Sequence, residues 1–195
     1  MKARYRLAWF VVVLLSAAAP AYAQDRWDVR LAEEIAREVS AYSRFTIFDD
    51  VNARVENGVV ALAGKVTMPF KKDEIGARVA RIDGVREVDN RIEVLPVSPL
   101  DDQLRYRIAR AIYGSPSFWR YAAMANPPIH IIVERGRVTL TGVVASHVER
   151  MLARSLATGW GELSVTSELR TDAEVRVEEA MPNSQRPTPK ALGAV

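Results

Sequence analysis

The chain of 195 residues contains no cysteine. This absence excludes disulfides, thiolate catalysis, Cys-ligated zinc and iron–sulfur clusters. It also excludes the lipidated cysteine that a bacterial lipoprotein needs. Only two histidines are present, His130 and His147, and neither has a second histidine at the spacing of a zinc site. No metal site is expected, and both histidines are interpreted as ordinary surface or strand residues.

Motifs of catalysis and nucleotide binding are also missing. The chain has no Gly-x-Ser-x-Gly elbow and no Ser-x-x-Lys motif. Its Gly58–Lys65 stretch has five residues between the glycines and Val66 where a phosphate loop needs Ser or Thr, which excludes nucleotide binding. The adjacent acids at 49–50, 73–74 and 101–102 fall in loops or at helix starts, where capping and solvation explain them. We expect that the protein is not an enzyme and that it binds no cofactor and no small-molecule substrate.

Neither positive nor negative charge predominates over most of the chain. The net charge is +3, from 27 Lys and Arg against 24 Asp and Glu. Residues 1–23 hold Lys2, Arg4 and Arg6 and no acid, so the remainder has 24 cations and 24 anions. A neutral remainder does not favour binding to nucleic acid, which depends on basic side chains.

The first residues have the pattern of a secretory signal peptide. A basic start is followed by an apolar run over residues 7–19, with Ser16 as its one polar residue, and by Ala21-Tyr22-Ala23. The run is too short for a membrane-spanning helix, which needs about 20 apolar residues. The sequence therefore predicts a signal peptide over residues 1–23, cleavage after Ala23, and a periplasmic protein.

The chain repeats itself. Residues 55–66 read VENGVVALAGKV and residues 133–144 read VERGRVTLTGVV, with seven of twelve positions identical at a constant offset of 78. Upstream, an apolar stripe at 31, 35 and 39 recurs at 104, 108 and 112. The offset there is 73, so the second copy has five extra residues between helix and strand.

Each copy predicts the order helix–strand–strand–helix–strand. The stripes with a period near four predict amphipathic helices, and we expect Asp28 and Asp101 to cap the starts of the first helix of each copy. The alternating segments predict hairpins whose turn glycine takes a positive φ. A second helix is expected over 72–82, with Ile75, Val79 and Ile82 inside. Its counterpart over 146–158 is expected to bury Val148, Met151 and Leu152.

This arrangement predicts a two-layer α/β unit, of the α+β type, in which both helices cover one face of a three-stranded sheet. The expected units span residues 27–97 and 101–171, joined by a proline-containing linker. Residues 172–195 are expected to form a tail, disordered beyond about residue 180. The following four glycines are assigned to turns and strand exits of the fold and not to a site: Gly58, Gly64, Gly136 and Gly142.

The hairpin motif V-x-x-G-x-V-x-L-x-G-x-V, the following helix, and a closing Gly84, Val85, Val88, Asn90, Ile92 and Val94 resemble the BON domain family. The second copy departs from the pattern with Ser167 where Asn is expected. Two copies behind a signal peptide resemble osmotically inducible periplasmic members of this family. The resemblance implies envelope maintenance, osmotic or envelope stress, and binding of anionic phospholipid, without catalysis.

The second copy holds the candidate lipid-binding residues. It carries nine cations, all Arg, against six acids, whereas residues 27–97 carry 11 cations and 13 acids. Arginine suits phosphate oxygens, and Trp and Tyr favour the headgroup layer of a membrane. The candidates lie around the five-residue insertion: Arg105, Arg107, Arg110, Phe118, Trp119, Arg120 and Tyr121.

Lipid contact requires these rings to be exposed. Four Arg at about 1 kcal/mol each give only millimolar affinity, so part of Phe118 and Trp119 must enter the bilayer. Two other interpretations remain open: the rings pack in the core or between the units, or they bind a protein. A protein-binding or chaperone-like role for envelope proteins, by addition of a peptide to a sheet edge, is the alternative function.

Overall fold

The structure, a computed structural model, describes residues 19–181 and the side chains of residues 26–178, 180 and 181. Most of the predicted signal peptide lies outside this range, as do residues 182–195 of the predicted tail. The first unit comprises α1 (Ala19–Ser40), β1 (Asp50–Glu56), β2 (Val59–Val66), α2 (Pro69–Val79) and β3 (Glu87–Val94). The second comprises α3 (Pro99–Tyr113), the 3₁₀ helix η2 (Pro116–Phe118), α4 (Trp119–Ala122), β4 (Ile129–Glu134), β5 (Arg137–Val144), α5 (His147–Leu156), β6 (Ser164–Ser167) and β7 (Arg170–Thr171).

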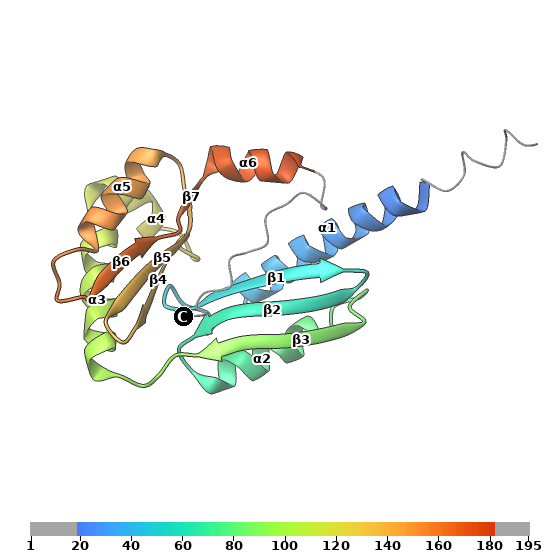
Figure 1. The fold of residues 1–195 in the computed structure, drawn as a ribbon, viewed down its shortest axis with the longest axis horizontal. Coiled ribbons are helices and arrows are strands. Elements are labelled where there is room, and N and C mark those ends of the chain that lie inside the picture. The colour runs from blue at the N-terminus through green and yellow to red at the C-terminus, as the bar shows by residue number, and fades with distance from the viewer. Residues whose placement is uncertain (1–18, 182–195) are drawn as a thin grey trace, which may run out of the picture.

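The two sheets have the same topology (Figure 1). In each, the first two strands form an antiparallel hairpin and the third lies parallel to the second. In the second unit the last strand is broken, and β6 and β7 both pair with β5. The predicted α+β fold of two repeated units is confirmed.

Each unit has its own core between helices and sheet. The first core contains the predicted stripe of α1 and Ile75 and Val79 of α2, with Ile82 partly buried. In the second unit the stripe of α3 is buried as predicted, but Val148 and Met151 of α5 are 74% and 52% exposed. The prediction that Val148 and Met151 are buried was wrong. The helix α5 packs against the sheet through the small side chains of Ala153 and Ala157 instead.

Asp28 and Asp101 hold hairpin turns and do not cap their helices. The Asp28 carboxylate accepts a hydrogen bond from the Asn57 N–H at 2.9 Å, and that of Asp101 accepts from the N–H groups of Arg135 and Gly136. Asp28 lies in the middle of α1, and α3 is capped by the Ser98 side chain instead. The same acid therefore fastens helix to hairpin in both units.

Gly64 and Gly142 lie within β2 and β5, short of the strand exits where we expected them. Both have positive φ, at 128° and 111°. A Cβ at Gly64 would lie 2.1 Å from the carbonyl oxygen of Asp50, and one at Gly142 would lie 1.8 Å from that of Pro128. The hairpin strands approach so closely here that only glycine fits.

We expect Gly142→Ala to destabilise the protein more than Gly159→Ala. Both glycines have positive φ, which alone costs about 1–3 kcal/mol for another residue. Only at Gly142 must a backbone carbonyl also move, because no atom lies within 4 Å of a Cβ built at Gly159. Urea unfolding of both variants measures the difference, and equal losses would contradict the steric argument.

The third strands differ because one side-chain contact is present in only one unit. In the first unit the Asn90 amide donates to the Lys72 carbonyl of α2 and accepts from the Ile92 N–H. A Cβ at Gly76 would come within 2.5 Å of that amide. In the second unit the repeat places Ser167 and Arg154 at the positions of Asn90 and Gly76. The anchor to the helix is lost there, and the strand is short and broken.

A buried ion pair fixes the start of α2. Asp49 is fully buried, and its Oδ2 lies 2.6 Å from the Nζ of Lys71, which is also buried. The hydroxyls and backbone N–H groups of Thr46 and Thr67 donate to the same carboxylate. Burial raises the pKa of Asp49, but the hydrogen bonds from Lys71, Thr67 and Thr46 outweigh it, so the pKa lies below its usual value.

We expect Asp49→Asn to lower the free energy of unfolding by about 3–5 kcal/mol at neutral pH, because it leaves the Lys71 ammonium buried without its counter-charge. A lowered pKa stabilises the native state fully above the unfolded value of about 3.9, and the contribution is lost as the pH falls through the native value. Urea unfolding across this acid range measures it. A variant as acid-sensitive as the wild type would contradict this assignment.

The loop between α1 and β1 joins the two units. Phe45 packs into the first core, whereas Ile47 and Phe48 pack against the second. The Ile47 carbonyl accepts a hydrogen bond from the Ile131 N–H of β4 at 2.7 Å. The Phe48 ring stands edge-on to Tyr106, with 5.2 Å between ring centroids. One short loop therefore contributes side chains to both cores.

Polar side chains add a second contact between the units. Lys65 of β2 forms an ion pair with Glu134 of β4. Beside it, Asp50 of β1 faces His130 and Arg170 of the second unit. Burial raises the pKa of Asp50, against the attraction of His130. The end of the first sheet thus covers part of the open face of the second.

Residues 172–180, expected to be tail, form the helix α6 (Asp172–Ala180). Thr171 and Glu174 form a capping box at its start, which satisfies free N–H groups. Ion pairs of Arg150 with Glu174 and of Arg170 with Glu178 fasten the helix to the second unit. Local capping chemistry, and not apolar periodicity, therefore makes this helix.

Candidate functional site

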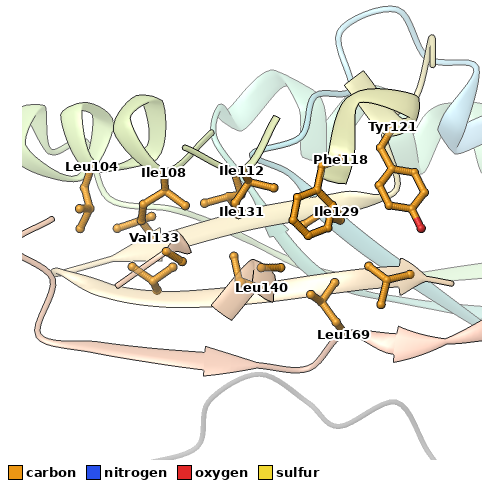
Figure 2. Packing of buried hydrophobic residues seen from close by; sticks show 14 residues of the cluster. Leu104, Ile108, Ile112, Phe118, Tyr121, Ile129, Ile131, Val133, Leu140 and Leu169 are labelled. Atoms are coloured by element: carbon orange, nitrogen blue, oxygen red, sulfur yellow. The ribbon is translucent and has the colours of Figure 1, made fainter. Parts of the chain in front are cut away.

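The insertion that carries the aromatic residues is folded into the second unit. Phe118 and Tyr121 are 0% and 6% exposed, whereas their neighbour Trp119 is 75% exposed. Phe118 ends η2 and points into the core beside Ile129 (Figure 2). Of the two rings required to be exposed for lipid contact, only Trp119 meets the condition. The core interpretation, left open by the sequence, is correct for Phe118 and Tyr121.

Tyr121 is the centre of a polar network. Its hydroxyl donates to the Glu149 carboxylate at 2.7 Å and accepts from the Ala145 N–H at 2.9 Å and from Arg120 at 2.8 Å. Burial, and then the bond to Glu149, raise the pKa of Tyr121, so the phenol stays protonated and donates. In the first unit Asp49 binds the N–H of Thr67, the repeat counterpart of Ala145. Tyr121 of the insertion thus binds in the second unit the backbone N–H whose counterpart Asp49 binds in the first.

Arg105 is also unavailable to a ligand. It is 3% exposed, pairs with Asp102, and donates through Nη2 to the Val133 carbonyl at 2.5 Å. Arg107, Arg110 and Arg120 are exposed. Of the seven predicted residues, the structure therefore leaves four at the surface: Arg107, Arg110, Trp119 and Arg120.

The exposed candidates belong to the outer side of the helix layer of the second unit. α3 and α5 pack together over one face of the sheet, and Arg120 of α4 pairs with Glu149 of α5. The solvent side of α5 adds the exposed Val148, Met151 and Arg154. We call this surface the α3–α5 surface; it comprises Arg107, Arg110, Trp119, Arg120, Val148, Met151 and Arg154.

Three arginines of the α3–α5 surface have no partner in the described part of the chain: Arg107, Arg110 and Arg154. The helix layer of the first unit is different, because acids accompany its cations. There Glu38 pairs with Arg78, and Glu33 and Glu34 are exposed on α1. Arg30 and Arg37 of α1 are also exposed and make no ion pair within the described residues, but Glu33 and Glu34 lie between them. The second helix layer therefore differs in having fewer acids among its exposed arginines.

Sequence reasoning missed Val148, Met151 and Arg154. A signal for them was present in the repeat. At the offset of 78, Ile75 and Val79 correspond to Ala153 and Ala157, which identifies the face of α5 that meets the sheet. Residues 148 and 151 then lie on the opposite face by helix geometry, and Arg154 lies on the exposed flank between the two faces, at the repeat position of Gly76.

We expect Phe118→Ala to cost about 3–5 kcal/mol of stability, because it leaves a cavity in the second core. Trp119→Ala, one residue further, is expected to change stability by no more than about 0.5 kcal/mol because its ring lies at the surface. Urea unfolding followed by circular dichroism measures both. Similar costs for the two variants would contradict the burial described above.

No group of three or more His, Asp or Glu able to hold a metal occurs within residues 26–181. None of the helices over the described range is long and apolar enough to cross a membrane. A pocket of about 370 Å³ lies between the units, and Phe45, Pro127, Pro128 and His130 are among its lining residues. With one titratable side chain, His130, among its lining residues, it offers no acid–base pair.

Comparison with known proteins decides the family. The BON domain profile matches residues 27–96 and 101–173, most of the chain and one match per unit. The chain belongs to the BON domain family. BON domains are non-catalytic binding modules associated with membranes, phospholipid and envelope stress, and BON proteins are typically periplasmic or membrane-associated.

Two solved structures of CdsD, a structural protein of the type III secretion system of Chlamydia trachomatis, show low similarity. One has 14% identity and a TM-score of 0.29, and covers 80% of this chain and 100% of its own. The other, of the C-terminal domain, has 15% identity and a TM-score of 0.26, and covers 70% of this chain and 96% of its own. No curated protein sequence matches the chain.

Proposed function

We propose that this BON protein binds anionic phospholipid through the α3–α5 surface of its second unit. The observation that carries the proposal is the set of unpaired arginines Arg107, Arg110 and Arg154 beside the exposed Trp119 and Met151. Guanidinium groups match phosphate oxygens, and an indole ring is favoured at the level of lipid headgroups. The buried Arg105, Phe118 and Tyr121 take no part.

The affinity needs both kinds of side chain. Three arginines near an anionic membrane contribute about 3 kcal/mol, which alone gives weaker than millimolar binding. Burying the exposed parts of Trp119 and Met151 adds up to about 1.5–3 kcal/mol for each. The sum corresponds to reversible attachment, which suits a module that visits the membrane without anchoring in it.

The N-terminal sequence supports a place for this activity. If residues 1–23 are a signal peptide cleaved after Ala23, the protein works in the periplasm, where the outer leaflet of the inner membrane presents acidic headgroups. The role we propose there is maintenance of the envelope under osmotic or other envelope stress, by contact with lipid and without catalysis.

Co-sedimentation with liposomes tests the lipid site. The protein, purified after export from cells that express the full chain, is mixed with vesicles of phosphatidylcholine, alone or with phosphatidylglycerol or cardiolipin. We expect pelleting with the anionic vesicles at low salt and less at high salt, where charges are screened. Reversing Arg107, Arg110 and Arg154 to Glu is expected to weaken binding about 100-fold or more, and Trp119→Ala about tenfold.

The matched control reverses Arg30, Arg37 and Arg81, which are exposed on the first unit, so the net charge changes equally. This control is expected to bind nearly as the wild type does. Equal losses in the two triple variants would mean that total charge, and not the α3–α5 surface, governs binding. No pelleting of the wild type at low salt would overturn the proposal altogether.

A further inference from the structure

The outer edge of the second sheet is closed. Along β4 the Tyr113 hydroxyl donates to the Ile129 carbonyl, the Ile131 N–H donates to Ile47, and Arg105 donates to the Val133 carbonyl. Residues 129, 131 and 133 alternate along the strand, so their polar groups point to the same side, away from β5. Two side chains and one loop thus satisfy the edge, and no further strand is able to pair there.

The corresponding edge of the first sheet lacks these contacts. At the offset of 78, the equivalents of 129, 131 and 133 are Val51, Ala53 and Val55 of β1, an outer strand of its sheet (Figure 1). Apart from the ladder with β2, their backbone groups make no hydrogen bond within the described residues. This edge therefore offers N–H and C=O groups to a further strand.

The helix beside this edge explains the difference. At the offset of 73, the positions of Arg105 and Tyr113 are taken by Ala32 and Ser40 of α1. Neither side chain is long enough to reach the strand. Ala36 is exposed between them. The first unit thus has small side chains along the strip where the second unit places its two capping residues.

We infer that the outer edge of β1 binds an extended peptide segment of another protein, which adds to the sheet as a strand and lays a branched apolar side chain beside Ala32 and Ala36. This surface lies on the first unit and is independent of the α3–α5 surface. The chemistry of the ligand is indicated by the loop that occupies the equivalent edge of β4. There Ile47 supplies a backbone carbonyl, and the side chains of Ile47 and Phe48 are partly buried.

A second copy of the chain fits this edge less well. Antiparallel pairing of two β1 strands centred on Ala53 sets Asp50 opposite Glu56 of the copy, and like charges in opposite positions are unfavourable. Pairing centred on Asn52 requires Asp50 to face Arg54 of the copy. Asp50, however, already faces His130 and Arg170 of its own second unit. A peptide that places no acid opposite Glu56 and needs no contact with Asp50 avoids both conflicts.

The test uses a synthetic peptide with the sequence of residues 43–50, SRFTIFDD, and the exported, purified protein. Titration followed by ¹⁵N–¹H spectra is expected to move the amide signals of Ala53 and Val55 in a saturable way. The variant Ala32→Arg, Ser40→Tyr transfers the two caps of the second unit to the first. It is expected to weaken peptide binding at least tenfold while the amide signals of the second unit stay in place, apart from those of residues 125–128 and His130, which line a pocket with Ser40.

The control Glu34→Arg, Arg37→Tyr introduces the same residue types on the opposite flank of α1 with the same change in net charge. It is expected to bind the peptide as the wild type does. No saturable shift, equal binding by the capped variant, or shifts confined to Ile131 and Tyr106 would overturn the inference.

Two further outcomes would replace the peptide by another occupant and also overturn it. One is a dimer in sedimentation that the capped variant abolishes, which identifies a second copy. The other is an Ala53 amide already protected from hydrogen exchange in the free protein and released by removal of residues 182–195, which identifies the chain's own C-terminal segment.

Discussion

A three-stranded sheet with two helices on one face buries only that face, and this constraint governs the rest of the protein. A unit of about 70 residues has few residues with which to cover the second face and the two edges of its sheet. The second unit solves this with help from the first. Its Ile132, on the face away from the helices, is only 3% exposed, and the loop carrying Ile47 lies along its outer strand.

The two repeats share one fold and differ in contacts that the fold does not require. The acid that holds the hairpin turn and the glycine beneath a carbonyl are common to both. The polar anchor near the start of the second helix is Asp49 with Lys71 in one unit and Tyr121 with Glu149 in the other. Divergence has therefore given the units different surfaces: mixed charge on the first helix layer, and arginine with exposed apolar side chains on the second.

A feature of the structure could be predicted from the sequence where it depends on residues that are close together along the chain. Turn glycines and strand alternation are local, so the hairpins and the helices facing them were predictable from the repeat. Phe118 and Tyr121 were not, because the insertion has no counterpart in the first copy to indicate its environment. For α5, apolar periodicity favoured Val148 and Met151 over two alanines, although in a tightly packed layer the smaller side chains allow the closer approach. Asp28 and Asp101 were predicted to be caps because they lie near the expected helix starts. The hairpin turn that each of them binds is distant in the sequence, so this contact was not predictable from position alone.

The loop carrying Phe45, Ile47 and Phe48 has a consequence for how the protein folds. Because its side chains enter both cores, neither unit keeps its full set of contacts when the other is lost. The edge and the core of the second unit are complete only with the loop from the first half of the chain, which is made first during synthesis from the N-terminus. This shared loop favours unfolding of the two repeats in one transition, and the short proline-containing linker is then a chain connection within one fold.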